Sequence, residues 1–163
     1  MNYNSDFSTH IFNEKTIVRI IEKWRREKNR IVFTNGCFDI LHLGHVDYLY
    51  KASKLADKLI VGLNSDSSVK RIKEKNRPVQ GEKSRSSVLA ALKFVDAVVI
   101  FNEETPQQLI EIVQPHILVK GADYKINNIV GSDFVISNGG NVETIDFMPG
   151  YSTSDIINKI KNG

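Results

Sequence analysis

The sequence contains a single cysteine, Cys37, so the chain cannot form an internal disulfide, which suits a reducing compartment. No apolar run approaches the roughly 20 residues that a membrane-spanning helix needs. The first residues, MNYNSDFSTH, lack the basic and then apolar layout of a signal peptide. We therefore expect a cytoplasmic protein that has no membrane partner.

Excess positive charge is also lacking, because the formal net charge at pH 7 is only +3. A dedicated nucleic-acid-binding protein would carry a dense basic stripe, so we expect no nucleic-acid partner. A chain of 163 residues is long enough to bury a core that needs neither a metal nor a disulfide. Charge and length together indicate an ordinary globular domain.

Three common active-site motifs are absent as well. The phosphate-binding loop GxxxxGK[ST], the dinucleotide fingerprint GxGxxG and the nucleophile elbow GxSxG do not occur in the sequence. These motifs are typical of kinases, dehydrogenases and hydrolases respectively. Their absence removes the best support for those three classes of enzyme.

The chain divides into a short N-terminal part and one larger unit. Residues 1–12 look like a loose arm, and apolar residues at helical spacing predict a helix from Asn13, its N-cap, to about Lys28. We therefore take residues 1–29 as an N-terminal arm and helix, and residues 30–163 as the main domain of a single compact unit.

From residue 31 onward, short strands rich in valine and isoleucine alternate with helices. The expected strands are 31–34, 58–63, 97–101, 117–120 and 142–147. The expected helices are 44–56, 84–94, 106–113, 131–138 and 153–161. Strands of this composition are buried on both faces of a sheet. The pattern predicts an α/β fold with a Rossmann-like, doubly wound, parallel five-stranded sheet in the order 3-2-1-4-5 and an extra N-terminal helix.

Two histidines, His42 and His45, stand near the start of the helix that follows the first strand. Residues three apart share one face of a helix, and the free N–H groups of a first turn attract anions. Gly44 between them leaves room for a ligand close to the backbone. The spacing favours a site for a reacting phosphoryl group, although two surface histidines explain it equally well. We expect no metal site, because no third zinc ligand is evident.

The segment NGCFD at 35–39 follows the same strand. Gly36 would allow backbone N–H groups to cradle phosphates. Asp39 is expected to fix the turn by bonding the backbone, a structural role that we favour over a catalytic one. Cys37 is interpreted as a packing residue rather than as a nucleophile.

Three later groups lie at positions where ligands bind in such sheets. A basic stretch follows the second strand: Lys70, Arg71, Lys73, Lys75 and Arg77. Most of it is expected to be a solvated face, with one or two residues neutralising a triphosphate or a sugar phosphate. Lys120 and Asp123 follow the fourth strand at the switch point, where contact with a ligand is favoured over a surface pair. Three hydroxyls at 152–154 open the last helix, as N-caps or as a phosphate site.

The motifs taken together resemble those of a known group of enzymes. HLGH after the first strand, with STS at the last helix, resembles the HxGH nucleotidyltransferase superfamily, the cytidylyltransferase-like group. The sequence is also similar, more specifically, to the D-glycero-β-D-manno-heptose 1-phosphate adenylyltransferases of ADP-heptose synthesis. Six segments together carry this resemblance: "TNGCFDILHLGHVDYL", "LIVGLNSDSSVKRIK", "RPV", "TPQQLI", "LVKGADY" and "STSDIINKI". The resemblance spans about residues 30–161.

This resemblance implies a fold of the nucleotidylyl transferase type and a reaction. AMP would pass from ATP to heptose 1-phosphate by direct in-line attack on the α-phosphate, giving ADP-heptose and pyrophosphate. ADP-heptose would serve the lipopolysaccharide inner core or other surface glycans. Mg²⁺ would arrive with ATP. A separate heptose 7-phosphate kinase would act upstream, since no sugar kinase domain is found, and a homodimer is suggested.

Residue roles are assigned from the motifs and the resemblance together. The expected catalytic residues are His42, His45, Lys70 and Lys120. The expected nucleotide-binding residues are Asn35, Gly36, Cys37, Phe38, His42, Gly44, His45, Lys120, Gly121, Asp123, Ser152 and Thr153. The expected substrate-binding residues are Asp39, Lys70, Arg77, Arg85 and Asp123.

The sequence departs from the expected pattern at two positions near the site. Ala122 stands in place of a second glycine, and Tyr151 stands in place of a small residue. Two other functions stay open: a cytidylyltransferase acting on glycerol 3-phosphate or another phosphorylated acceptor, and a non-catalytic nucleotide-binding sensor module. Retention of both histidines, Lys120 and the STS segment argues against the sensor.

Overall fold

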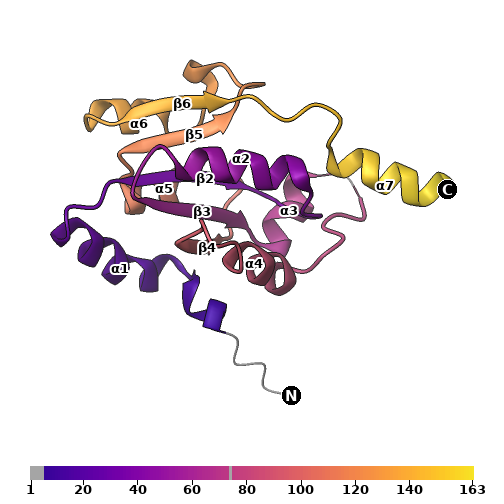
Figure 1. The fold of residues 1–163 in the computed structure, drawn as a ribbon, viewed down its shortest axis with the longest axis horizontal. Coiled ribbons are helices and arrows are strands. Elements are labelled where there is room, and N and C mark those ends of the chain that lie inside the picture. Colours follow the sequence, from indigo (N-terminus) through magenta and orange to yellow (C-terminus); the bar gives the residue numbers. More distant parts are fainter. Residues whose placement is uncertain (1–5, 74) are drawn as a thin grey trace.

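A six-stranded sheet, parallel throughout, forms the centre of the computed structural model, which describes residues 6–73 and 75–163 (Figure 1). The strands are β1 (Ile11–Phe12), β2 (Ile31–Gly36), β3 (Lys58–Asn64), β4 (Ala97–Phe101), β5 (Ile117–Gly121) and β6 (Asn141–Ile145). Their spatial order is β1-β4-β3-β2-β5-β6. The five predicted strands take the predicted order 3-2-1-4-5, so the Rossmann-like topology is confirmed.

Helices cover both faces of the sheet. They are α1 (Glu14–Arg26), α2 (Leu43–Ser53), α3 (Asp66–Ile72), α4 (Glu82–Ala90), α5 (Gln107–Val113), α6 (Ser132–Ser137) and α7 (Thr153–Asn162). Two short 3₁₀ helices span Asp6–His10 and Ile126–Asn128. No helix in the described part of the chain is both long and apolar enough to cross a bilayer.

Two hydrophobic cores lie on opposite faces because side chains alternate along each strand. Ile31 and Phe33 of β2 pack with apolar residues of α1, α5 and α6. Val32, between them in the sequence, packs with residues of α2 and α4. This burial on both faces explains why the strands read as nearly continuous apolar runs.

The prediction that residues 1–12 form a loose arm was wrong for the described residues. Ile11 and Phe12 form the two-residue strand β1, in register with Val98 and Val99 of β4. This strand covers an edge of β4 whose backbone groups would otherwise be unpaired. A two-residue strand has too few positions to produce a periodic pattern, so sequence analysis counted five strands where the described residues form six.

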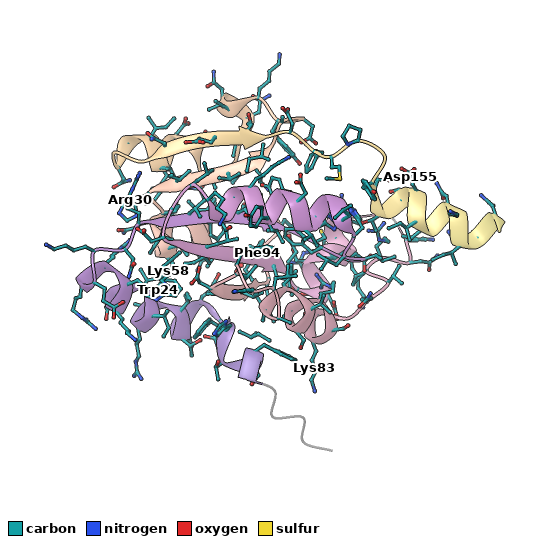
Figure 2. All side chains as sticks on the ribbon, viewed as in Figure 1. Trp24, Arg30, Lys58, Lys83, Phe94 and Asp155 are labelled. Carbon is teal, nitrogen blue, oxygen red and sulfur yellow. The ribbon has the colours of Figure 1, made fainter. Side chains whose placement is uncertain are left out.

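The N-terminal helix begins where it is predicted to begin. Asn13 Oδ1 accepts a hydrogen bond from the N–H of Thr16, and Thr16 Oγ1 accepts one from the N–H of Asn13, each at 3.0 Å. This reciprocal capping box satisfies two free donors of the first turn. Near the other end of α1, Trp24 lies beneath the ammonium group of Lys58, 5.6 Å from its ring centre (Figure 2). The helix is thereby attached to the sheet at the end away from the carboxyl ends of the strands.

Candidate active site

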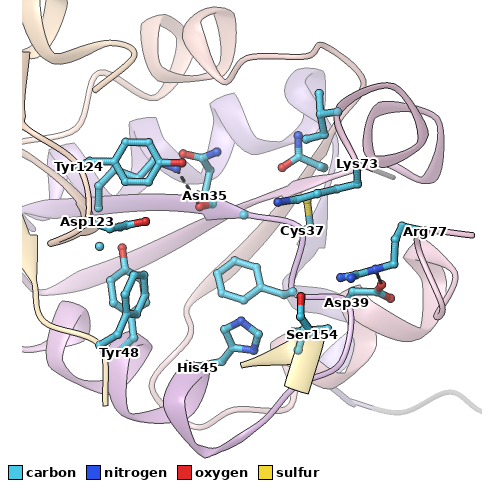
Figure 3. Close-up of a pocket in the computed structure, with 18 of the residues that line it drawn as sticks. Asn35, Cys37, Asp39, His45, Tyr48, Lys73, Arg77, Asp123, Tyr124 and Ser154 are labelled. Carbon is cyan, nitrogen blue, oxygen red and sulfur yellow. Dashed lines mark hydrogen bonds and ion pairs between the residues drawn. The ribbon is translucent and has the colours of Figure 1, made fainter. Parts of the chain in front are cut away.

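A cavity of about 1000 Å³ lies beyond the carboxyl ends of β2, β3 and β5 (Figure 3). Strand order reverses between β2 and β5, which is where ligands bind in open parallel sheets. Predicted site residues that line it are Asn35, Gly36, Cys37, Phe38, Asp39, His45, Arg77, Lys120, Gly121, Asp123 and Thr153. Those that do not line it are His42, Gly44, Lys70, Arg85 and Ser152.

The two histidines lie together at the start of α2. His42 is the N-cap of the helix, and its Nδ1 accepts the backbone N–H of His45 at 3.4 Å. Because Nδ1 accepts this bond, the proton of the neutral ring is on Nε2. The two rings are stacked, with centroids 3.8 Å apart and an angle of 19° between their planes. His42 thus supports His45 from behind while His45 lines the cavity.

Both imidazoles are held in the neutral state. Burial, together with the neighbouring His42, lowers the pKa of His45 to about 4. A hydrogen bond to the backbone of Ile40 opposes this shift but does not reverse it. Burial also lowers the pKa of His42. Nδ1 of His45 is buried without a hydrogen-bond partner in the described part of the chain. His45 therefore offers a neutral hydrogen-bonding group to the cavity at pH 7, rather than a positive charge.

The loop after β2 brings an aromatic ring against this pair. Phe38 meets His45 edge-on, with centroids 5.2 Å apart. A Cβ on Gly36 would come within 3.0 Å of the Phe38 ring, so glycine makes room for that ring. Burial raises the pKa of the Cys37 thiol despite the nearby cations Lys73, Arg85 and Arg77, which keeps the thiol neutral. A neutral thiol is a poor nucleophile, in keeping with a packing role.

Lys120 of β5 lies on the wall next to β2. Its ammonium donates a hydrogen bond to the carbonyl oxygen of Asn35 at 3.2 Å and lies 5.6 Å from the ring centre of Tyr124. Burial lowers its pKa to about 8, against the opposing influence of Asp123. Lys120 is thus positively charged near neutral pH. Its ammonium group has three N–H donors, so beside the bond to Asn35 it can donate to a ligand at the switch point.

Polar groups with spare hydrogen-bonding capacity lie beside Lys120. Oδ1 of Asn35 is buried and has no partner among the described residues. Figure 3 shows Asn35, Asp123, Tyr124 and Tyr48 on one side of the cavity. Sequence analysis missed Tyr48, whose hydroxyl is 2.7 Å from that of Thr34. The sequence could have indicated Tyr48, because it stands three residues after His45 and therefore shares the same face of α2.

The opposite wall is cationic, but Lys70 is not part of it. Lys70 lies in the last turn of α3 and is exposed, whereas Lys73, Lys75 and Arg77 line the cavity. We call these three residues the basic segment. The difference arises because α3, which sequence analysis did not predict, turns Lys70 away before the chain reaches the cavity.

Asp39 fastens the basic segment to the loop after β2. Its buried carboxylate accepts hydrogen bonds from Arg77 Nε at 2.5 Å, from the N–H of Val79 at 2.8 Å and from the N–H of Gln80 at 2.9 Å. Burial alone would raise the pKa of Asp39, but these donors outweigh it and hold the pKa below its usual value. The carboxylate is thus fully occupied, which agrees with the structural role favoured from the sequence.

Arg85 lies beneath the site rather than in it. Its side chain is buried and donates hydrogen bonds to the carbonyls of Cys37 at 2.6 Å, Asn64 at 2.9 Å and Gln80 at 2.9 Å. It also pairs with the carboxylate of Asp66 at 2.8 Å. The guanidinium therefore ties three loops together, and the predicted contact between Arg85 and the substrate finds no support in its position.

Helix α7 closes one side of the cavity, which it lines from its first turn to Lys161. Ser152 is the N-cap, because its Oγ accepts the N–H of Asp155 at 3.0 Å. Thr153 and Ser154 line the cavity, and Thr153 Oγ1 donates to the carbonyl of Ile40 at 3.5 Å. The hydroxyls at 152–154 therefore divide their roles: Ser152 caps the helix, while the next two residues face the ligand space.

Comparison with known proteins shows that residues 33–159 match the cytidylyltransferase-like family. The chain belongs to this family. The chain therefore contains a nucleotidyltransferase domain.

Curated relatives of this cytidylyltransferase-like chain are bifunctional proteins. It is 51% identical over 158 residues to the bifunctional protein HldE of Geotalea uraniireducens, covering 97% of this chain and 32% of the relative. It is 55% identical over 150 residues to the bifunctional protein HldE of Campylobacter fetus, covering 91% and 32%. The chain thus spans about a third of the length of these relatives.

The crystal structure of the lipopolysaccharide core biosynthesis protein from Thermoplasma volcanium is similar to this cytidylyltransferase-like fold. The TM-score is 0.61 at 30% sequence identity, covering 74% of this chain and 97% of the other.

No group of three or more histidine, cysteine, aspartate or glutamate residues that could hold a metal ion is found among residues 6–73 and 75–163.

Proposed function

We propose that this chain transfers AMP from ATP to D-glycero-β-D-manno-heptose 1-phosphate, releasing ADP-heptose and pyrophosphate. The observation that carries the proposal is one cavity in which His45, Lys120 and the hydroxyls of Thr153 and Ser154 face the basic segment. Such a cavity has room and donors for a triphosphate and for a second phosphate. The resemblance in the motifs and the likeness to a lipopolysaccharide core biosynthesis protein support a heptose acceptor.

The reaction needs positioning and charge neutralisation more than covalent chemistry. An oxygen of the sugar phosphate attacks the α-phosphorus of ATP in line and forms a new P–O bond. The bond from the α-phosphorus to the bridging oxygen breaks, and pyrophosphate leaves with the electron pair. Mg²⁺ belongs to the substrate, as its complex with ATP. No protein nucleophile is needed, so a neutral Cys37 is compatible with this chemistry.

The proposed roles follow from the walls of the cavity. His45, supported by His42, donates to the phosphate oxygens on which charge grows, and Lys120 neutralises the phosphate chain beside β5. Lys73 and Lys75 of the basic segment hold the phosphate of the acceptor. A heptose 7-phosphate kinase would supply that acceptor, and the reaction would take place in the cytoplasm, where ATP is available.

Pyrophosphate release with a panel of substrates tests the proposal. ATP and CTP are each combined with heptose 1-phosphate, glycerol 3-phosphate and other sugar phosphates, and the product is identified by mass spectrometry. We expect ADP-heptose from the first combination. Turnover of CTP with glycerol 3-phosphate, and none of ATP with heptose 1-phosphate, would show a cytidylyltransferase instead. Nucleotide binding without any turnover would show a sensor module.

The two residues at the start of α7 are expected to respond differently to alanine. Ser152→Ala removes the cap and should lower the free energy of unfolding by about 1 kcal/mol. Thr153→Ala should leave stability nearly unchanged and raise KM for ATP, because Thr153 lines the cavity without capping the helix. Thermal unfolding and steady-state kinetics measure both effects. Normal ATP kinetics for Thr153→Ala would contradict the proposed phosphate contact.

The affinity for ATP is expected to fall as the pH rises through about 8. The pKa of Lys120 is lowered to about 8, so this side chain is positively charged below that pH and neutral above it. Only the charged form attracts the phosphates, so KM for ATP should increase on the alkaline side. The Lys120→Met variant should have a higher KM and no inflection near this pH. An inflection that persists in Lys120→Met would assign it to another group.

A further inference from the structure

Tyr151 stands directly before the Ser152 cap of α7, and its ring belongs to a series of aromatic contacts. The ring is nearly parallel to that of His42, with an angle of 21° and a centroid distance of 6.4 Å. His42 is stacked on His45 at 3.8 Å, and His45 meets Phe38 at 5.2 Å. Four rings thus connect the start of α7 with the loop after β2.

The backbone of Gly44 brings Tyr151 and His42 to the same place. A Cβ on Gly44 would lie 3.0 Å from Cβ of Tyr151 and 3.1 Å from Nδ1 of His42. Both distances are shorter than most Cβ contacts in proteins, so a larger residue at position 44 would push Tyr151 or His42 away by a few tenths of an ångström. Tyr151 therefore rests on the first turn of α2, the turn that carries the histidine pair.

Helix α7 has little else to hold its first turn in position. None of its residues is fully buried, and it extends away from the sheet at one end of the molecule (Figure 1). Thr153 reaches the carbonyl of Ile40 only at 3.5 Å, a weak bond. The packing of Tyr151 on Gly44 and its ring contact with His42 thus link the start of α7 to the first turn of α2.

We propose that Tyr151 is a positioning residue: its ring orients His42 against His45 and fixes the first turn of α7, so that histidines and hydroxyls face one phosphate chain. The kinetic part of this inference rests on the proposed adenylyl transfer. Tyr151 does not line the cavity, and 44% of its surface is exposed, so its role is exerted through His42 and Thr153.

Substitution of Tyr151 separates positioning from direct contact with substrate. Tyr151→Ser should lower kcat between about 10- and 100-fold, the larger loss matching a displacement near 1 Å. KM for ATP should rise, while KM for the sugar phosphate should stay unchanged, because the basic segment lies on another wall. Tyr151→Phe keeps the ring and should restore near-normal kinetics. Tyr50→Ser, which removes an exposed tyrosine of α2 outside the cavity, is the matched control.

NMR of histidine-labelled, substrate-free protein gives a readout that does not depend on turnover. The ring signals of His42 should shift in Tyr151→Ser and stay in place in Tyr151→Phe and Tyr50→Ser. If Tyr151→Ser does not fold, Gly44→Ala displaces the same contact from the other side and should shift the same signals.

Two outcomes would overturn the proposal. One is wild-type kcat together with unshifted His42 signals in Tyr151→Ser. The other is a raised KM with unshifted His42 signals, which would mean that Tyr151 touches the substrate itself. Inactivity of the wild-type protein with every substrate pair would instead reject the proposed function, and the NMR result would still decide whether Tyr151 orients His42.

Discussion

His45→Ala is expected to lower kcat by about 10²–10³-fold, or about 2.7–4 kcal/mol of transition-state stabilisation, in a protein that stays folded. The imidazole is held in the cavity by the ring of His42 at 3.8 Å and by Phe38, so its donor is positioned before the substrate binds. It acts on charge that grows as pyrophosphate leaves. The loss should therefore fall mainly on kcat, with smaller changes in KM for ATP.

His42→Ala is expected to cause a loss of the same order through two effects. The variant removes one imidazole and also the ring that supports His45. The double variant should consequently lose less than the product of the two single losses, because both residues act on one phosphoryl group. Steady-state kinetics and circular dichroism measure these effects. His10→Ala, which removes an exposed histidine of the N-terminal 3₁₀ helix that does not line the cavity, is the matched control.

Near-normal turnover of either single variant would make that histidine structural.

The pH dependence of kcat separates neutral histidine donors from charged ones. Burial lowers the pKa of both rings, and that of His45 to about 4, so His45 stays neutral from weakly acidic to alkaline pH. The kcat should then show no loss near pH 6.5 from histidine deprotonation. A fall in kcat centred there, absent in the double variant, would mean that the imidazolium form is the active one.

Arg85→Met is expected to lower the free energy of unfolding by about 3–5 kcal/mol, because it removes one partner of a buried, hydrogen-bonded charge network. The carbonyls of Cys37, Asn64 and Gln80 would lose their donor; the bond to Asn64 is buried and the other two are partly buried, and a buried acceptor left unpaired costs about 1–3 kcal/mol. Asp66 is partly exposed and would be rehydrated, which limits the loss. Urea unfolding followed by circular dichroism measures this change.

The comparison of stability with kinetics decides between the two roles considered for Arg85. Arg71→Met, which removes a partly exposed arginine that pairs with Glu104, should change stability by less than about 1 kcal/mol. If Arg85→Met were as stable as the wild type and raised KM only for the sugar phosphate, Arg85 would contact the substrate as the sequence analysis predicts. We expect the loss of stability instead, because the guanidinium is enclosed.

The sequence by itself determined the class of fold, the order of five strands and the region of the active site. Strand composition and helical spacing are local properties, so β2–β6 and the start of α1 at Asn13 could be read from consecutive residues. The rule that ligands bind at the switch point then placed His45 and Lys120 together, although they are 75 positions apart in the sequence. Nothing local indicated β1, whose two residues are ordered only because the edge of β4 accepts them.

Only the tertiary structure decided which polar residues face the ligand. Lys70 and Lys73 belong to the same basic stretch and are both exposed, yet only Lys73, which follows the end of α3, lines the cavity. Arg85 was a plausible phosphate ligand until its acceptors from three separate loops were known. The contacts of Tyr48 with Thr34 and of Tyr151 with His42 became visible only in the folded structure. The physical reason is that a sequence pattern fixes the element and the face of a residue, whereas the direction and hydrogen bonding of its side chain depend on segments distant in the chain.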